Sequence, residues 1–192
     1  EILKAYFKPY LDIAKSAGTG LVLDSPTWRA SPDWAEPIGF ADLAELADAN
    51  KRGLELADQI RKANATPDMP IVVSGCIGPR GDGYDPGQQM SVEEAENYHA
   101  WQIGIFATGP ADLVSAITIN NVNEAVGIAR ATRTHAIPVV ISFTLETDGR
   151  LPTGDNLGDA IAGVDAATSA YPAYYMINCA HPTHFAETLA SA

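Results

Sequence analysis

The sequence has few cysteines, few basic residues and no long apolar run, and each shortage excludes a class of protein. Its 192 residues include only two cysteines, Cys76 and Cys179, too few for a disulfide scaffold, so we expect a reducing, cytoplasmic setting. Lys and Arg number 12 against 24 Asp and Glu, and the net charge of −12 predicts neither nucleic acid nor an anionic membrane as a partner. No run of about 18 apolar residues occurs, so no transmembrane helix is predicted.

What the sequence does contain is a regular alternation of helical and strand patterns. Hydrophobic residues make up 46% and charged residues 19%, a globular composition that fits a single domain or part of one. Short runs typical of buried strands lie at 21–23, 71–73, 112–118, 137–143 and 174–178. Helical spacing of apolar residues or capping signals predict helices at 3–14, 43–60, 91–106, from 121, around 161, and at 184–189.

This alternation predicts a mainly parallel sheet covered by helices, because parallel strands need long crossovers. An open doubly wound sheet and a (β/α)8 TIM barrel both fit, but no strand is followed at once by a dinucleotide-binding or phosphate-binding loop motif. The chain begins with a helical pattern and stops inside one, and a barrel needs about 250 residues. We therefore predict one partial barrel domain over 1–192, truncated, from the first helix to the start of the sixth.

The segment around Cys179 is the most informative of the predicted strand ends. Reactive residues of parallel α/β folds lie where strands end, and Cys179 closes the run at 174–178, with His181 and His184 close behind. Thiolates and imidazoles are zinc ligands, so Cys-x-His-x-x-His is a candidate metal cluster. The alternative is a buried cysteine that acts as a small hydrophobic residue, beside two solvent-facing histidines.

Other strand ends carry weaker candidates. Cys76 lies in the glycine-rich segment 75–87, where it is either reactive or simply small enough for a tight turn. The glycines of that segment resemble an anion cradle, although a flexible loop is the simpler interpretation. The carboxylates Asp24, Glu146 and Asp148 follow strands as well, and they are either acids and bases or merely solvated side chains.

Several of these segments together resemble one enzyme family. Val73–Pro79 resembles the glycine-rich third strand of the homocysteine S-methyltransferase family, and Met176–Cys179 its sixth-strand motif, which ends in a zinc-binding cysteine. Leu23–Ser31 is similar to its second strand, and Val140–Phe143 with Asp148–Gly154 to its fifth strand and the following loop. The resemblance spans essentially the whole chain in the right order.

The resemblance implies a (β/α)8 barrel in which zinc activates a thiol, usually homocysteine, for methyl transfer that gives methionine or a related thioether. Cys179 matches the first of three cysteine ligands. The other two form an adjacent pair in a Gly-Gly-Cys-Cys motif at strand eight, so they are expected outside this chain, as are strand one and strand seven. We therefore expect the piece alone to be inactive and, because its sheet edges are open, oligomeric or partly unfolded.

The same resemblance implies a small-molecule thiol and a methyl donor as ligands, the donor being a sulfonium, an ammonium compound or a folate. It points to substrate-binding roles for Asp24, Thr27, Gly75, Cys76, Thr118 and Asn178.

One position departs from the family pattern. The family usually carries Glu-Thr after strand four, where the glutamate holds the substrate's amino group, but this chain has Ile117-Thr118. An aliphatic side chain cannot make that contact, so a thiol other than homocysteine becomes a candidate acceptor. Two further functions stay open: a barrel lyase or hydrolase that uses His181, His184 and a carboxylate such as Asp24, and a non-catalytic binding domain.

Overall fold

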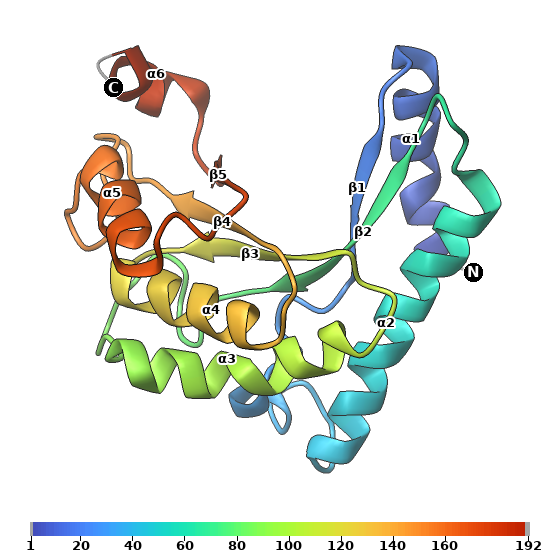
Figure 1. Ribbon diagram of the computed structural model, residues 1–192, viewed down its shortest axis with the longest axis horizontal. Helices are drawn as coiled ribbons and strands as arrows, with labels where there is room; N and C mark the ends of the chain where they lie inside the picture. The colour runs from blue at the N-terminus through green and yellow to red at the C-terminus, as the bar shows by residue number, and fades with distance from the viewer. Residues whose placement is uncertain (1, 191–192) are drawn as a thin grey trace.

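A computed structural model describes residues 2–190 and shows five parallel strands in one sheet (Figure 1). The strands pair in the order in which the chain visits them, each with its sequence neighbours. They are β1 Leu21–Asp24, β2 Ile71–Ile77, β3 Leu113–Ile119, β4 Val139–Thr144 and β5 Tyr174–Asn178. A doubly wound sheet would instead reverse its strand order near the middle, so the arrangement is an arc of a (β/α)8 barrel, as predicted.

Helices alternate with the strands, and short polar residues set where several of them begin. Ser91 and Glu94 form the predicted capping box of α3, while Asn121 caps α4 through the backbone N–H of Glu124. None of the helices in residues 2–190 is long and apolar enough to span a membrane. The helices are α1 Ile2–Ala17, the short η1 Pro32–Trp34, α2 Leu43–Asn64, α3 Val92–Ala107, α4 Val122–Thr134, α5 Leu157–Thr168 and α6 Pro182–Ala190.

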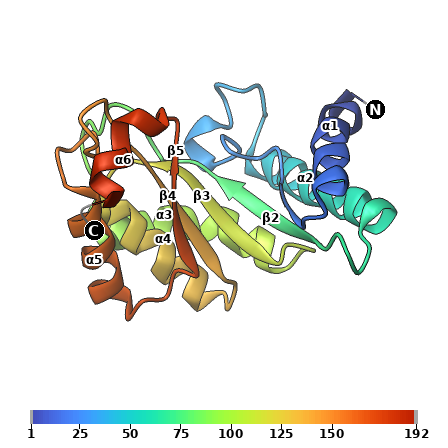
Figure 2. The same ribbon diagram turned by 90° about the horizontal axis from the view of Figure 1, so that it is seen from above.

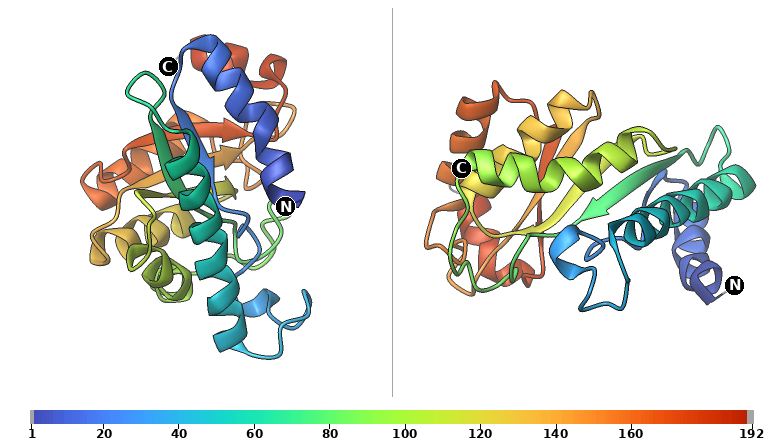
Figure 3. Two further views of the ribbon diagram at one scale, coloured as in Figure 1. Left: turned by 90° about the vertical axis from the view of Figure 1, so that its right-hand side faces the viewer. Right: turned by 90° about the horizontal axis from the view of Figure 1, so that it is seen from below.

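The sheet is curved, and its two faces have different surroundings. Helices α2 to α5 lie around the outer side of the arc, while β2 to β5 follow one another side by side (Figures 1 and 2). Seen from below, the helices cover this outer, convex face (Figure 3, right). Residues that point outward from the strands, such as Val73, Val114 and Phe143, belong to the hydrophobic core beneath those helices.

The alternate residues of the same strands point to the inner, concave face. They include Ser74 on β2, Ser115 on β3 and Ser142 on β4, and all three side chains are buried. Period-two alternation along each strand directs an apolar set outward, whereas the inner set combines these serines with apolar residues such as Ile117 and Val140. The concave face is therefore the place where polar chemistry is possible.

Two details of the strands differ from the sequence prediction. The glycine-rich segment was predicted to follow a short strand, but β2 continues through Gly75 to Ile77. A Cβ at Gly75 would lie 2.3 Å from Cδ2 of Phe106, so the glycine lets α3 pack closely on the strand. The last strand was predicted to be buried, whereas β5 is only partly buried, because in the described residues it pairs with β4 alone.

Candidate functional site

Three of the predicted site residues meet where β3 and β5 end. Asn178 Oδ1 accepts hydrogen bonds from the Thr118 backbone N–H at 3.0 Å and from Ser142 Oγ at 2.8 Å. Its Nδ2 donates to Thr118 Oγ1 at 2.8 Å and to Cys179 Sγ at 3.1 Å. One amide group therefore joins the end of β3, the inner face of β4 and the cysteine.

The backbone at this cluster is held in an unfavourable conformation. Thr118 has φ of 68° and Cys179 has φ of 55°, in the left-handed region that non-glycine residues avoid. The pairing of β3 with β4 shifts register between Ile117 and Ile119, so Thr118 forms an irregularity in the ladder. Such strain costs on the order of 1–3 kcal/mol per residue and persists where surrounding contacts impose it. The bonds from Asn178 are the contacts that hold Thr118.

The Cys179 thiol is exposed and lies within reach of a loop that crosses from β2. Tyr84, in the loop after β2, forms a side-chain hydrogen bond with Cys179, and this bond, with smaller contributions from burial and from nearby negative charge such as that of Asp82, raises the pKa of Tyr84. Gly83, beside it, lies against Thr118. The exposed Cys179 thiol thus has hydrogen-bonding groups from two parts of the chain beside it.

Zinc was predicted at Cys179, with its remaining cysteine ligands outside the chain. Within residues 2–190, no three or more His, Cys, Asp and Glu side chains are grouped so that they could hold a metal ion. The imidazole Nδ1 of His181 lies 2.8 Å from Thr183 Oγ1, and the rings of His181 and His184 are 6.0 Å apart. The Cys-x-His-x-x-His cluster is therefore not formed, and the described residues supply a single thiol rather than a complete site.

A second group of inward-facing residues lies on β1, β2 and β3, around Asp24. The hydroxyls of Ser74 and Ser115 are 2.7 Å apart, and both hydrogen-bond the Asp24 carboxylate. Burial raises the pKa of Asp24, although these two hydrogen bonds oppose the shift. Burial and the neighbouring carboxylate raise the pKa of the Cys76 thiol, which is 7% exposed. A buried thiol with a raised pKa is a poor nucleophile.

Thr27 makes contacts within the fold that the sequence did not predict. Its buried hydroxyl donates to the Cys76 carbonyl at 2.8 Å and lies 2.7 Å from Ser25 Oγ. Ser25 Oγ in turn accepts the Cys76 backbone N–H at 3.1 Å. These bonds attach the loop after β1 to the end of β2. Gly75 was also predicted to bind substrate. The position that a Cβ of Gly75 would occupy faces α3 and therefore points away from the concave face.

An arginine between two tryptophans fixes the glycine-rich loop after β2. The Arg29 guanidinium lies 4.1 Å from the ring centre of Trp28 and 4.3 Å from that of Trp34. It donates hydrogen bonds to the carbonyls of Pro79 at 3.0 Å and Gly81 at 2.7 Å. No sequence pattern indicated this arrangement, because the partners are about fifty positions apart in the chain.

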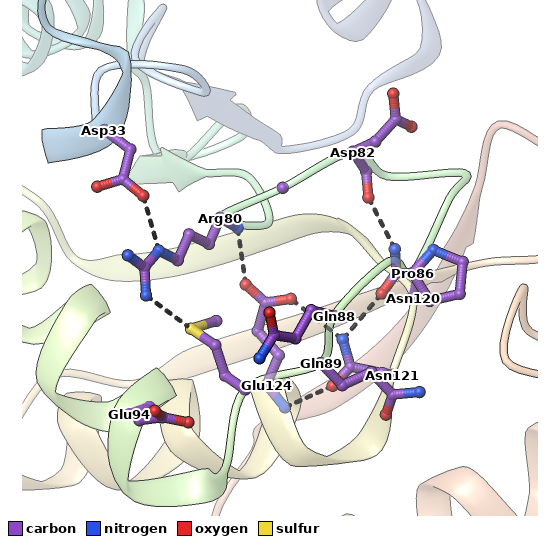
Figure 4. Close-up of a pocket in the computed structure, with 12 residues that line it drawn as sticks. Asp33, Arg80, Asp82, Pro86, Gln88, Gln89, Glu94, Asn120, Asn121 and Glu124 are labelled. Carbon is purple, nitrogen blue, oxygen red and sulfur yellow. Dashed lines mark hydrogen bonds and ion pairs between the residues drawn. The ribbon is translucent and has the colours of Figure 1, made fainter.

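A polar cavity of about 390 Å³ lies beside this loop, where β2 and β3 end (Figure 4). Arg80 crosses it, with its side chain 2.7 Å from Asp33 and its backbone N–H donating to Glu124 at 2.7 Å. Glu124 also pairs with the buried His99 at 2.9 Å. Burial would raise the pKa of Glu124, but the hydrogen bonds and charge of His99, the Arg80 N–H and Asn121 outweigh it, so the pKa is lowered. No sequence pattern indicated that His99 pairs with Glu124, because the two residues belong to different helices.

Comparisons with known proteins agree with this architecture. The chain is similar to the homocysteine methyltransferase MmuM from Escherichia coli in its metallated form, with 24% identity and a TM-score of 0.72, over 82% of this chain and 57% of that one. For the apo form of MmuM the identity is 25% and the TM-score 0.64, over 83% of this chain and 56% of that one. The chain thus spans little more than half the length of these structures.

At the sequence level, no curated protein matches the chain. The family model described as homocysteine S-methyltransferase matches residues 1–192, which is the whole sequence. This match agrees with the resemblance of the strand-end motifs and with the barrel arc. The chain belongs to the homocysteine S-methyltransferase family.

Proposed function

We propose that the chain forms part of an enzyme that transfers a methyl group to a thiol, with homocysteine or a related thiol as acceptor. In this proposal Cys179 is one of the ligands of a zinc ion, and the other protein ligands come from outside residues 1–192. The concave face of the sheet holds the acceptor, through the cluster at Thr118 and Asn178 and through the polar group at Asp24.

The observation that carries the proposal is the position of Cys179. It follows β5 directly, at the end of the strands where barrel enzymes keep their active sites, and its thiol is exposed. Asn178 Nδ2 donates a hydrogen bond to the Cys179 sulfur. Oδ1 of the same side chain accepts the backbone N–H of Thr118, whose backbone is strained. Strain that several contacts maintain at a strand end is typical of functional sites.

A zinc ion supplies one chemical effect here: it binds a thiol as the thiolate and so makes a nucleophile available at neutral pH. In the transfer, the acceptor S–H loses its proton to solvent water, and a sulfur–carbon bond forms to the methyl group. The bond between that methyl group and the donor breaks, and its electron pair stays with the donor. The chain's own contribution is to place the acceptor, with Asn178 and Tyr84 forming hydrogen bonds to the Cys179 side chain.

The lyase or hydrolase alternative receives no support from the geometry. Asp24 is on β1 and the two histidines follow β5, which are the two edges of the five-stranded sheet. His181 is exposed, and its imidazole is engaged by Thr183. Acid–base catalysis would need these groups within hydrogen-bonding reach of one reacting atom.

The test is zinc content and methyl transfer by the full-length protein. Purified protein is analysed for metal and then incubated with homocysteine and, in turn, a sulfonium, a betaine and a methylfolate donor, with thioether formation followed by mass spectrometry. We expect about one zinc per chain and thioether formation with one donor class. Metal-free protein that binds no added zinc, with no thioether from any donor, would contradict the proposal.

A further inference from the structure

Tyr84 follows β2 in the chain but reaches the cysteine that follows β5. The tyrosine is 56% exposed, and its side chain forms a hydrogen bond with that of Cys179. Strands β3 and β4 lie between β2 and β5 in the sheet, so the contact joins parts of the sheet that are not neighbours. Holding a loop in one conformation costs backbone entropy, so a contact over this span requires other bonds that fix the loop.

The loop just before the tyrosine is fixed by hydrogen bonds from three other segments of the chain. Arg29 donates to the Gly81 carbonyl at 2.7 Å, the Arg80 N–H donates to Glu124 at 2.7 Å, and Asn120 Nδ2 donates to the Asp82 carbonyl at 2.8 Å (Figure 4). Three consecutive residues thus have backbone groups bonded to the loop after β1, to the end of β3 and to α4. These bonds fix the course of the loop before the tyrosine.

The backbone at the tyrosine itself is fixed by a tight turn and by a close approach to β3. Asp82 Oδ1 accepts the backbone N–H of Tyr84 at 2.8 Å and that of Asp85 at 3.3 Å. A Cβ at Gly83 would lie 2.5 Å from Cγ2 of Thr118, so the loop passes this strand end at a distance that only glycine allows. The phenol is therefore directed to the end of β5 by its own loop.

The phenol and the sulfur are suited to a hydrogen bond in which the tyrosine is the donor. The bond raises the pKa of Tyr84, as expected for a phenol that donates its proton to the sulfur of Cys179. A thiolate is the form of cysteine that binds a metal ion, and a hydrogen bond to a charged acceptor is stronger than one to a neutral acceptor. Groups that hydrogen-bond a metal ligand orient that ligand and tune its affinity for the metal.

We propose that Tyr84 is a positioning residue of the metal site, whose hydroxyl donates a hydrogen bond to the zinc-bound thiolate of Cys179 and thereby strengthens zinc binding. This inference rests on the proposed function, in which Cys179 is a zinc ligand. It assigns a task to the loop after β2: the bonds at residues 80–82 hold the loop so that its tyrosine meets the sulfur.

The test removes the hydroxyl and leaves the ring. Zinc affinity of the full-length protein is measured by competition with a chromophoric chelator, and the absorption spectrum is recorded after loading with Co²⁺. Tyr84→Phe should bind zinc about tenfold more weakly. Its sulfur-to-cobalt charge-transfer band should move to longer wavelength, because the sulfur lone pairs lose a stabilising hydrogen bond. Loss of loop structure alone would not produce that shift.

Tyr174→Phe is the matched control, because Tyr174 is an exposed tyrosine at the start of β5, at the other end of the strand from Cys179. It should leave the zinc affinity and the cobalt spectrum unchanged. Either a cobalt spectrum of Tyr84→Phe identical to wild type or an equal zinc affinity would overturn the inference alone. If wild type binds neither zinc nor cobalt, the proposed function fails, and the inference fails with it.

Discussion

The convex and concave faces of the sheet are made by the same five strands but have different surroundings. On the convex face, Val73, Val114 and Phe143 are fully buried under helices, and even one added carbon at Gly75 would overlap the ring of Phe106. On the concave face, serines, an aspartate and an asparagine form hydrogen bonds across neighbouring strands. Close packing supplies stability on one face, and hydrogen-bonded polar side chains line the other.

Because the two faces have different surroundings, substitutions on the convex face and on the concave face should change different measured properties. Removing or enlarging a side chain on the convex face should change the free energy of unfolding. Replacing an inward-facing polar residue near a strand end should change ligand binding first. Four predictions test this division, beginning with the largest effect.

The largest effect is expected at Cys179. In the full-length protein, Cys179→Ala should abolish stoichiometric zinc binding, because the variant loses a thiolate ligand. Its thermal stability in the zinc-free state should stay close to wild type, since the residue is exposed. Cys76→Ser is the matched control and should keep its zinc, because the buried Cys76 thiol faces Asp24 rather than Cys179. Equal zinc content in wild type and Cys179→Ala, by elemental analysis, would contradict the assignment.

The second effect concerns packing on the convex face. Gly75→Ala should lower the free energy of unfolding by about 3 kcal/mol, because the new Cβ would lie 2.3 Å from the Phe106 ring and α3 would have to move. Gly81→Ala is the control, since no heavy atom lies within 4 Å of its Cβ position, and it should stay within about 0.5 kcal/mol of wild type. Urea denaturation measures both. Similar stabilities for the two variants would show that α3 does not pack on β2 in this way.

The third effect concerns the acceptor on the concave face. Ile117→Glu adds a carboxylate at the position where the family resemblance implies one, and it should lower the KM for homocysteine about tenfold, equal to about 1.4 kcal/mol. Ile117→Gln has a similar shape without the charge and should not show this gain. A micromolar KM of wild type for homocysteine would mean that Ile117 does not weaken acceptor binding.

The smallest effect is a pH dependence in the helical layer. Because the pKa of Glu124 is lowered in the fold, the hydrogen bonds that its carboxylate makes with His99 and the Arg80 N–H stabilise the protein above the unfolded pKa of about 4.3, and this contribution is lost as the pH falls through the lower folded pKa. Glu124→Gln cannot ionise, so its stability deficit relative to wild type should shrink as the pH drops below about 4.3. Urea denaturation across that range, with the exposed Glu36→Gln as control, measures the deficit. A deficit that is constant with pH would contradict the lowered pKa.

Much of the architecture was predictable because its causes are local. The capping box of Ser91 and Glu94 and the cap at Asn121 are read from residues three positions apart, and both begin helices as predicted. The barrel arc follows from the alternation of strand and helix periods, although the open sheet stayed possible until the sequential strand order excluded it. Cys179 was identified as a candidate because it directly follows a strand, and it does so in the structure.

The sequence by itself thus determined the elements, their order and the strand ends at which chemistry is possible. Only the tertiary structure decided which of those ends share a cluster. The bond from Asn178 to Thr118 joins residues 60 positions apart, and the pair of Glu124 with His99 spans 25. Such contacts depend on strand register, on the irregularity at Thr118 and on how closely helices approach the sheet. These three features produce no periodic pattern in the sequence, because they arise only when strands and helices pack against one another.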